Sequence, residues 1–440
     1  MSSTLLDTIV APATPVGRSA LAIVRIDGPL SGSILEQLSG SSPPEPRVAT
    51  LTQLIAIDEC IAIRYAAPHS FTGNDLVELT LHGNPLLVER LIAAAVRLGA
   101  RIAEPGEFTE RAVLNGKLDL VQAESIADLI NARTELQAKL SLGNLEGSLS
   151  RTAAAIRERL LFVISRLEAA LDFSEEGYEF IARGDARRLI AQAADDAAAL
   201  TETYRRGSAT IAGLTLVILG RPNAGKSTLL NRLVGTDRAI VTPIPGTTRD
   251  IVRETIEIGG LPVTIADTAG LRAGAEVVEA IGIERARAAG RGADIILYLV
   301  DATSGLTPAD RDELSAFVGK ELLVVYTKSD LAAAPEDELA ISVPSDRGVD
   351  TLLARLDALV RDRFAIPEAG AVVVNARQRQ AVAGGEEALR AALVSIDDGM
   401  DEQIILVDLY RASTSLGLLT GAITKDDVFT EIFSKFCIGK

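Results

Sequence analysis

The spacing of apolar residues changes several times along this chain, and each spacing predicts a different kind of structure. A short apolar run at 20–26 and an alternating run at 75–81 predict β-strands. From about residue 118 to residue 206, leucines and isoleucines recur every three or four positions, which predicts long helices. The glycines near which we expect these helices to break are Gly143, Gly147 and Gly184.

Further along the chain, apolar strand patterns alternate with helical stretches. The runs at 214–219, 295–300 and 322–326 are almost continuously apolar, as expected of parallel strands that are covered on both faces. Two more predicted strands are joined by Gly259 and Gly260, which favours a β-hairpin. This alternation is typical of a doubly wound α/β domain.

A helical pattern returns after the α/β region, so the simplest architecture is a helical domain with an α/β domain inserted into it. We therefore predict a multidomain chain of α/β and α parts. It would comprise an N-terminal α+β domain at 1–118, a first helical part at 119–212, the α/β domain at 213–367 and a second helical part at 368–440.

The amino-acid composition narrows the class of protein and the cellular compartment that we expect. Of the 440 residues, 48% are hydrophobic and 24% are charged, the balance of a soluble protein with a sizeable core. No apolar run approaches the ~18 residues of a membrane-spanning helix, and no secretory signal pattern is visible. With two cysteines and two histidines, we expect neither a disulfide framework nor a histidine-rich metal site. These features predict a cytoplasmic protein without membrane contact.

The charge balance limits how the chain can bind nucleic acid. It has 44 basic and 60 acidic residues, a formal net charge of −16. Such a surface repels nucleic acid on average, so any RNA contact must use a local basic patch.

Residues 220–227 read Gly-Arg-Pro-Asn-Ala-Gly-Lys-Ser and fit the P-loop motif G-x-x-x-x-G-K-[ST]. The motif directly follows a predicted strand and opens a predicted helix, as it requires. Its glycines let backbone N–H groups wrap phosphates. Lys226 would reach the β- and γ-phosphates, and the Ser227 hydroxyl would ligate Mg²⁺.

Three further segments are those expected of a GTPase. Residues 246–250 (Gly-Thr-Thr-Arg-Asp) lie where a γ-phosphate-sensing loop belongs, and Thr248 would offer Mg²⁺ a second hydroxyl. Residues 267–270 (Asp-Thr-Ala-Gly) follow the hairpin, where the aspartate would hold Mg²⁺ through water. Residues 327–330 (Thr-Lys-Ser-Asp) would select guanine, because a buried carboxylate accepts hydrogen bonds from its N1–H and 2-amino groups.

Three positions depart from the usual GTPase pattern. Thr327 stands where asparagine is usual, and Val343, after Ser342, stands where alanine is usual. We expect a weaker but still guanine-selective pocket. Leu271 occupies the place of the glutamine that orients water in Ras-like enzymes. A leucine cannot orient water, so the hydrolytic group must come from elsewhere.

Beyond these motifs, the chain resembles the tRNA-modification GTPase family called MnmE or TrmE over nearly its whole length. Besides the GTPase motifs, the resemblance is carried by residues 7–11 (Asp-Thr-Ile-Val-Ala), 15–18 (Pro-Val-Gly-Arg), 105–109 (Pro-Gly-Glu-Phe-Thr), 114–120 (Leu-Asn-Gly-Lys-Leu-Asp-Leu), 122–124 (Gln-Ala-Glu), 281–285 (Ile-Gly-Ile-Glu-Arg) and 436–440 (Phe-Cys-Ile-Gly-Lys). Several unrelated segments that agree in order are far more specific than a P-loop alone.

The resemblance implies that Glu279 orients the attacking water and that a potassium ion replaces an arginine finger. The implied potassium ligands are Asn223, Thr242, Ile244 and Thr247, and those of magnesium are Ser227 and Thr248. Motifs and resemblance together assign GTP binding to Asn223, Ala224, Gly225, Lys226, Ser227, Thr228, Thr242, Pro243, Ile244, Pro245, Gly246, Thr247, Thr248, Asp267, Thr268, Ala269, Gly270, Thr327, Lys328, Asp330, Ser342 and Val343. The ion site would be completed when two GTPase domains meet.

In that family the N-terminal domain binds a tetrahydrofolate one-carbon donor (the 5,10-methylene or 5-formyl form) and holds a homodimer together. The implied contacts are Arg25, Glu78, Lys117 and Lys440. A carboxylate can pair with the N–H donors of a pterin, and cations can meet its glutamate tail. Without the resemblance, Arg25 and Glu78 would be interpreted as surface charges on strands.

The end of the chain carries a helical stripe of Phe429, Phe433 and Phe436, which predicts that this tail docks onto a core. The resemblance also implies that Cys437 lies near the folate. Three roles are open to this cysteine: a nucleophile in the chemistry, a positioner of the ligand, or a packing residue. We include it with Glu279, Lys226 and Thr248 among the candidate catalytic residues.

The resemblance implies a homodimeric, potassium-stimulated GTPase that acts on tRNA. With an FAD-dependent partner of MnmG (GidA) type, in a heterotetramer, it would add an aminomethyl or carboxymethylaminomethyl group to C5 of the wobble uridine. One alternative is a GTP-switched RNA-binding factor, such as a ribosome-assembly GTPase, although no RNA module is recognisable. Another is a structural helical dimer with a vestigial GTPase domain, which the intact P-loop argues against.

Overall fold

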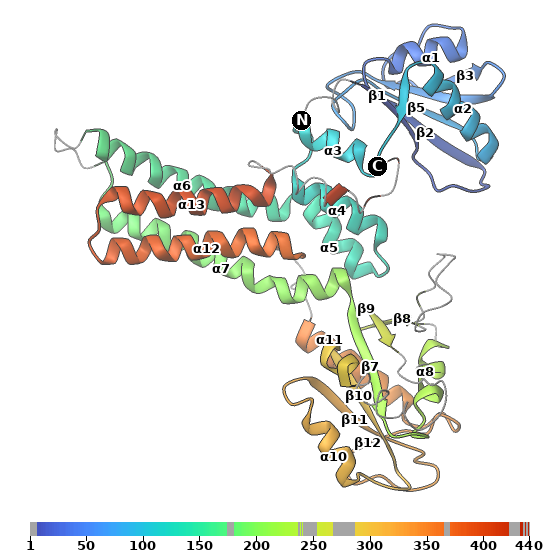
Figure 1. The fold of residues 1–440 in the computed structure, drawn as a ribbon, viewed down its shortest axis with the longest axis vertical. Helices are drawn as coiled ribbons and strands as arrows, with labels where there is room; N and C mark the ends of the chain where they lie inside the picture. The colour runs from blue at the N-terminus through green and yellow to red at the C-terminus, as the bar shows by residue number, and fades with distance from the viewer. Residues whose placement is uncertain are drawn as a thin grey trace. The chain divides into compact units, whose positions relative to one another are not determined.

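The computed structural model of the chain describes residues 7–173, 180–235, 238, 240, 253–266, 287–364, 370–421, 432–433, 436 and 439. The chain divides into two compact units. The first contains residues 1–127, 144–195 and 384–440, and the second contains residues 128–143 and 196–383. Figure 1 shows the helices and strands of both units.

The first unit contains a six-stranded sheet in the order β3-β4-β5-β2-β1-β6. Neighbouring strands run antiparallel except β1 and β6, which are parallel. The strands are β1 (Thr8–Pro12), β2 (Leu21–Asp27), β3 (Thr50–Leu54), β4 (Asp58–Tyr65), β5 (Leu76–His82) and β6 (Ala100–Ile102). Strands β2 and β5 confirm the two strands predicted at 20–26 and 75–81.

Helices α1 (Ser31–Ser39) and α2 (Pro85–Arg97) pack on one face of this sheet. Helix α2 begins where it does because the Asn84 side chain accepts a hydrogen bond from the Leu86 N–H and a proline occupies the first turn. On the other face, Phe108 of α3 (Glu107–Leu114) packs with Ile9 and Leu76. The sheet is therefore covered by helices on parts of both faces.

Long helices make up much of the remaining chain, as predicted. They are α4 (Leu120–Asn131), α5 (Glu135–Leu145), α6 (Ser148–Asp172), α7 (Arg183–Ala212), α12 (Ala376–Asp397) and α13 (Glu402–Thr420). In the first unit α6 lies beside α13, where the Tyr410 hydroxyl donates to Glu168. Gly147 precedes α6 in a left-handed conformation, as expected of a break. The break predicted near Gly143 is wrong, since α5 continues through it; a single glycine costs a helix only about 1 kcal/mol.

The two phenylalanines of the tail that the structure describes are buried. Phe433 and Phe436 are 4% and 8% exposed and pack with Leu120 and Ala123 of α4. Gly106 is also part of this contact, since a Cβ there would lie 2.8 Å from the carbonyl oxygen of Phe433. This packing confirms that the tail docks onto a core, while Phe429 lies outside the described residues.

The second unit contains a six-stranded sheet in the order β12-β11-β10-β7-β9-β8. Its strands are β7 (Leu214–Gly220), β8 (Arg253–Ile258), β9 (Leu261–Ala266), β10 (Ile295–Asp301), β11 (Glu321–Thr327) and β12 (Leu339–Ala340), and its helices include α8 (Lys226–Val234), α10 (Pro308–Ser315) and α11 (Val349–Phe364). Among these six strands, β8 and β9 pair antiparallel, through the predicted hairpin, and the other neighbours pair parallel. Successive residues of the central parallel strands belong alternately to two separate apolar clusters. The predicted doubly wound α/β fold is confirmed.

This strand order sets the position of the nucleotide motifs. Strand β7 lies between β10 and β9, and Gly220, Asp301 and Thr327 end their strands at the same edge of the sheet. Open α/β sheets bind ligands at the carboxyl ends of their strands. Among the described residues, no helix is both long enough and apolar enough to span a bilayer.

Candidate functional site

The loop between β7 and α8 has the backbone of a phosphate-binding loop. Gly220, Asn223 and Gly225 have φ values of +130°, +64° and +87°. Gly220 accepts no side chain, because a Cβ there would lie 2.3 Å from the carbonyl oxygen of Leu299. Helix α8 begins at Lys226 directly after this loop. The N–H groups of its first turn are therefore available to an anion.

Lys226 bridges the same loop. Its Nζ lies 2.7 Å from the carbonyl oxygens of both Gly220 and Arg221. Ser227 and Thr228 follow in the first turn of α8 and are exposed. An ammonium over the loop beside exposed hydroxyls matches what a phosphate and its Mg²⁺ require.

Thr327 ties the base-selecting motif to the P-loop. The residue is buried, and its hydroxyl lies 2.9 Å from the carbonyl oxygen of Ala224 and 3.2 Å from that of Val300. A hydroxyl has one hydrogen, so it donates to one carbonyl at a time. The threonine that replaces the usual asparagine is thus in hydrogen-bond contact with the loop.

Lys328 is held by an ion pair at the same edge of the sheet. Its backbone is left-handed (φ +57°), and its Nζ lies 2.5 Å from Oδ2 of Asp301. Burial opposes the ionisation of Asp301, but hydrogen bonds from Lys328 and Thr303 outweigh it and hold the pKa of Asp301 below its ordinary value. Asp330 follows two residues later and is exposed. Its carboxylate is therefore accessible to a ligand.

The segment after β12 brings in the last two predicted base contacts. The Ser329 N–H donates to the Ile341 carbonyl at 3.1 Å, which links the two loops. Ser342 is 1% exposed, and its hydroxyl has no partner among the described residues. Val343 packs against the core of the unit. A buried hydroxyl without a partner is costly, and the polar edge of a bound base can supply one.

Other predicted site residues lie outside the described residues. They are Thr242, Pro243, Ile244, Pro245, Gly246, Thr247, Thr248, Asp267, Thr268, Ala269, Gly270, Glu279, Cys437 and Lys440. Of the predicted metal ligands, Asn223 and Ser227 are described. In the part of the chain that the structure describes, no group of three or more His, Cys, Asp or Glu side chains could hold a metal ion.

In the first unit, two predicted cofactor residues face each other across β2 and β5. Arg25 and Glu78 are register partners, and the Arg25 Nε lies 2.8 Å from Oε1 of Glu78. The Tyr65 hydroxyl donates to Oε2 of Glu78 at 3.2 Å, and the Arg25 guanidinium lies 5.5 Å from the ring centre of Phe71. Burial and the Glu78 carboxylate raise the pKa of Tyr65. The group is partly open, with the Arg25 and Glu78 side chains 23% and 20% exposed.

Lys117 contacts the same region. Its Nζ donates to the Pro68 carbonyl at 3.2 Å, in the β4–β5 loop that also carries Phe71. Gly439 lies against β1, since a Cβ there would be 1.9 Å from the carbonyl oxygen of Pro12. Strand β1 pairs with β2, the strand of Arg25. Arg25 and Lys117 therefore both contact the β4–β5 loop, and Glu78 pairs with Arg25.

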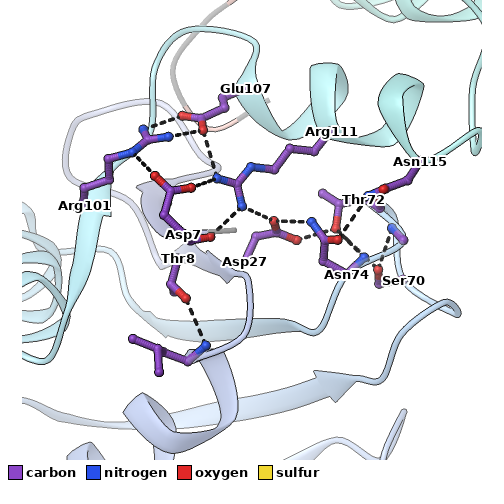
Figure 2. A network of polar contacts seen from close by, with 12 residues as sticks. Asp7, Thr8, Asp27, Ser70, Thr72, Asn74, Arg101, Glu107, Arg111 and Asn115 are labelled. Carbon is purple, nitrogen blue, oxygen red and sulfur yellow. Dashed lines mark hydrogen bonds and ion pairs between the residues drawn. The ribbon is translucent and has the colours of Figure 1, made fainter. Parts of the chain in front are cut away.

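A buried polar network beside the β4–β5 loop was not predicted from the sequence (Figure 2). Arg111 of α3 is 1% exposed and lies 2.9 Å from Oδ2 of Asp27 and 3.0 Å from Oε1 of Glu107. Asp27 also accepts hydrogen bonds from Thr72 and, at 3.0 Å, from Asn74, both in the β4–β5 loop. The network therefore fixes this loop to α3.

A P-loop at the carboxyl edge of a doubly wound sheet, followed by a Thr-Lys-Ser-Asp segment that contacts it, defines a P-loop GTPase domain within the second unit. Residues 8–117 match the family described as "GTP-binding protein TrmE N-terminus", and residues 120–437 match the "MnmE helical domain". The chain belongs to the MnmE family of tRNA modification GTPases.

Two relatives show how far the likeness extends. The "tRNA modification GTPase MnmE" of Koribacter versatilis is 39% identical over 451 residues, 99% of each chain. That of Thermotoga maritima is 39% identical over 458 residues, 99% of this chain and 100% of the relative. Among solved structures, a variant of Aquifex aeolicus Era bound to GDP.AlF4− is 27% identical, covering 40% of this chain and 66% of its own, with a TM-score of 0.27.

Proposed function

We propose that this protein is a potassium-stimulated GTPase that acts with a flavin-dependent partner. Together they would install a (carboxymethyl)aminomethyl group at C5 of the wobble uridine of tRNA, with one carbon from a tetrahydrofolate. The observation that carries the nucleotide part is the contact between Thr327 and Ala224, which joins a base-selecting segment to a phosphate-binding loop. Membership of the MnmE family supports the tRNA part.

GTP would bind along the loop between β7 and α8. The Lys226 ammonium would exchange a hydrogen bond to a backbone carbonyl for contacts with the β- and γ-phosphates. Its flexible side chain allows it to reach them. Asp330 would accept hydrogen bonds from N1–H and the 2-amino group of guanine. Adenine lacks both of these donors, so the carboxylate selects for guanine.

The predicted ion ligands suit the two ions. Ser227 and Thr248 offer hydroxyl oxygens, which Mg²⁺ prefers. Asn223 is exposed in a left-handed loop conformation and would share a potassium ion with Thr242, Ile244 and Thr247. A potassium ion bound there would stabilise negative charge that develops on the phosphates.

Glu279 would orient the attacking water, since Leu271 has no polar group to do so. An arginine finger accelerates hydrolysis by about 10³ to 10⁵. A site that works without one must supply about 4 to 7 kcal/mol of transition-state stabilisation by other means. Dimerisation of the GTPase domains, which would complete the ion site, couples hydrolysis to assembly.

The folate donor, as 5,10-methylene- or 5-formyl-tetrahydrofolate, would bind in the first unit. Glu78 would accept from the N–H donors of the pterin, while Arg25, Lys117 and Lys440 supply positive charge for a glutamate tail. The partly exposed ion pair of Arg25 and Glu78 beside the Phe71 ring supports this assignment. Cys437 is a candidate participant in the chemistry.

The remaining assignments concern partners. We infer a cytoplasmic homodimer that forms a heterotetramer with an FAD-dependent protein of MnmG (GidA) type and acts on tRNA. GTP hydrolysis would drive opening and closing of the GTPase domains and so regulate the complex.

Two measurements test the proposal. GTP turnover is measured in potassium and in sodium, for the wild-type protein and for Glu279→Ala. We expect fast turnover only for wild-type protein in potassium, with the GTP affinity of Glu279→Ala retained. Equal rates in both salts would refute the role of potassium, and full turnover by Glu279→Ala would remove Glu279 from the mechanism. Separately, deletion of the gene should abolish the wobble-uridine modification in bulk tRNA; unchanged tRNA would refute the biological role.

A further inference from the structure

We propose that a basic cavity in the second unit binds a phosphate group at the edge of the sheet opposite the P-loop. The cavity has a volume of about 490 Å³. It lies at the hairpin of Gly259 and Gly260, between β8 and β9. Strand β9 runs parallel to β7, so this hairpin is at the amino end of β7, and the P-loop follows its carboxyl end.

One wall of the cavity is a short segment that extends the sheet. The Ile240 N–H donates to the Thr255 carbonyl, and the Glu257 N–H donates to the Arg238 carbonyl, both at 2.9 Å. These bonds pair residues 238 and 240 with β8. The Arg238 side chain therefore starts from a backbone position that is fixed.

A second wall is helix α11, which is hydrogen-bonded to the hairpin and to Arg238. The Gly259 N–H donates to Oδ1 of Asp357 at 2.7 Å. Arg238 donates to both oxygens of Asp357, at 3.1 and 3.0 Å. Asp357 is thus neutralised by one arginine, while Arg361, one helical turn further on, also lines the cavity.

The third wall is Arg133, in the short connection between α4 and α5. The Arg133 N–H donates to Oε1 of Gln137 at 2.6 Å, and the Gln137 amide donates to the Ile211 carbonyl at 3.0 Å. Leu136 packs against the core of the unit. These contacts hold the backbone at Arg133 in place, while its side chain is exposed.

The charges of the cavity favour a single small anion. The cavity is lined by three arginines (Arg133, Arg238 and Arg361) and two carboxylates (Glu257 and Asp357), which gives the lining a formal charge of +1. Among the described residues, Arg133 and Arg361 make no ion pair, whereas Arg238 pairs with Asp357. A guanidinium presents a planar fork of donors that matches the oxygens of a phosphate.

The phosphate could belong to the tRNA backbone or to a small phosphorylated ligand, since both offer the same oxygens. The chain carries a net charge of −16, so an RNA that approaches it needs a local basic site. This inference uses neither the predicted nucleotide residues nor the folate residues, and it goes beyond the proposed function.

The first experiment measures binding of inorganic phosphate to the full-length, GDP-loaded protein by calorimetry. Arg133→Gln and Arg361→Gln are compared with Arg355→Gln, an exposed arginine of α11 that does not line the cavity. All three arginines are exposed, so the variants should fold. Each cavity variant should bind phosphate about 10-fold more weakly, and Arg355→Gln should match the wild-type protein. Absence of phosphate binding by the wild-type protein, or equal binding by all four proteins, would overturn the proposal.

The second experiment identifies the source of the phosphate. The affinity for tRNA is measured against salt concentration for the same four proteins. Loss of one phosphate contact should reduce the slope of log affinity against log salt by about 1. A reduced slope for the two cavity variants alone assigns the site to the RNA backbone. An unchanged slope with weakened binding of inorganic phosphate assigns it to a small phosphorylated ligand. GTP turnover without tRNA is recorded in parallel and reports separately on the proposed function.

Discussion

The Thr327 hydroxyl lies 2.9 Å from the carbonyl oxygen of Ala224, a residue 103 positions earlier in the chain. This contact joins the end of β11 to the middle of the P-loop. Because Ala224 is itself 1% exposed, water cannot replace the hydroxyl if it is lost. The contact therefore holds together the two loops to which we assign the phosphates and the base.

Thr327→Val should weaken GDP binding by about 10-fold. The substitution keeps the shape of the side chain but removes its donor, and a hydrogen bond contributes about 1 kcal/mol or slightly more. Titration calorimetry with GDP measures the change. Thr327→Ser keeps the hydroxyl and should bind GDP nearly as well as the wild-type protein. Unchanged affinity in Thr327→Val would show that the bond does not organise the loop.

Asp330→Asn should shift the base preference from guanine toward xanthine. An amide can donate to the 2-oxo group of xanthine, whereas the carboxylate accepts from the 2-amino group of guanine. Competition between GDP and xanthosine diphosphate measures the shift, and Asp346→Asn, outside the predicted site, is a control. Retained preference for GDP would contradict the assignment of Asp330.

Glu78→Gln should lower the affinity for 5-formyl-tetrahydrofolate by at least about 10-fold, because a charged acceptor becomes a neutral amide. Equilibrium dialysis with the folate measures the change. GTP turnover should not change, since Glu78 lies in the other unit. Glu59→Gln, an exposed residue of the neighbouring strand β4, is the matched control. Equal loss in both variants would point to a general effect of charge.

The stability of the first unit should fall in acid, in part through Asp7. Burial opposes the ionisation of Asp7, but hydrogen bonds and charge from Arg101 and Arg111 outweigh it, so the pKa of Asp7 lies below its ordinary value of 3.8. The stabilisation from its ionised form is complete above that ordinary value. It is lost as the pH falls through the lower pKa of the folded state.

Urea unfolding of wild-type protein and Asp7→Asn at a series of pH values checks this dependence. The wild-type protein should be the more stable at pH 7, and its advantage should shrink below about pH 4. Asp397→Asn is the control, because Asp397 and its partner Arg187 are 50% and 51% exposed, and exposed pairs add little. A constant difference between wild-type protein and Asp7→Asn across the series would refute the role of the Asp7 charge.

Local patterns in the sequence predicted most of the fold that surrounds the nucleotide site. The strand–loop–helix at the P-loop and the hairpin at Gly259 and Gly260 depend on short-range signals, namely apolar runs and glycines with positive φ. The exception is Gly143, where helix α5 continues because packing and neighbouring residues outweigh the cost of one glycine.

Long-range polar contacts could not be predicted in the same way. Arg111 and Asp27 lie 84 positions apart, and no periodicity relates them. The available signal was weak: an aspartate at the end of an apolar strand and an arginine within an amphipathic helix. The tie between Thr327 and Ala224 was likewise hidden, because the sequence shows only a departure from asparagine and not what the hydroxyl contacts.

The docking of Phe433 and Phe436 on Leu120 and Ala123 has a consequence for biosynthesis. Three hundred or so residues separate the two partners in the chain. A nascent chain on the ribosome exposes the apolar surface of α4 until Phe433 and Phe436 have been translated and have left the ribosome. During that interval the surface can bind chaperones or aggregate. A truncation that removes Phe433 and Phe436 should therefore reduce solubility more than it reduces nucleotide binding.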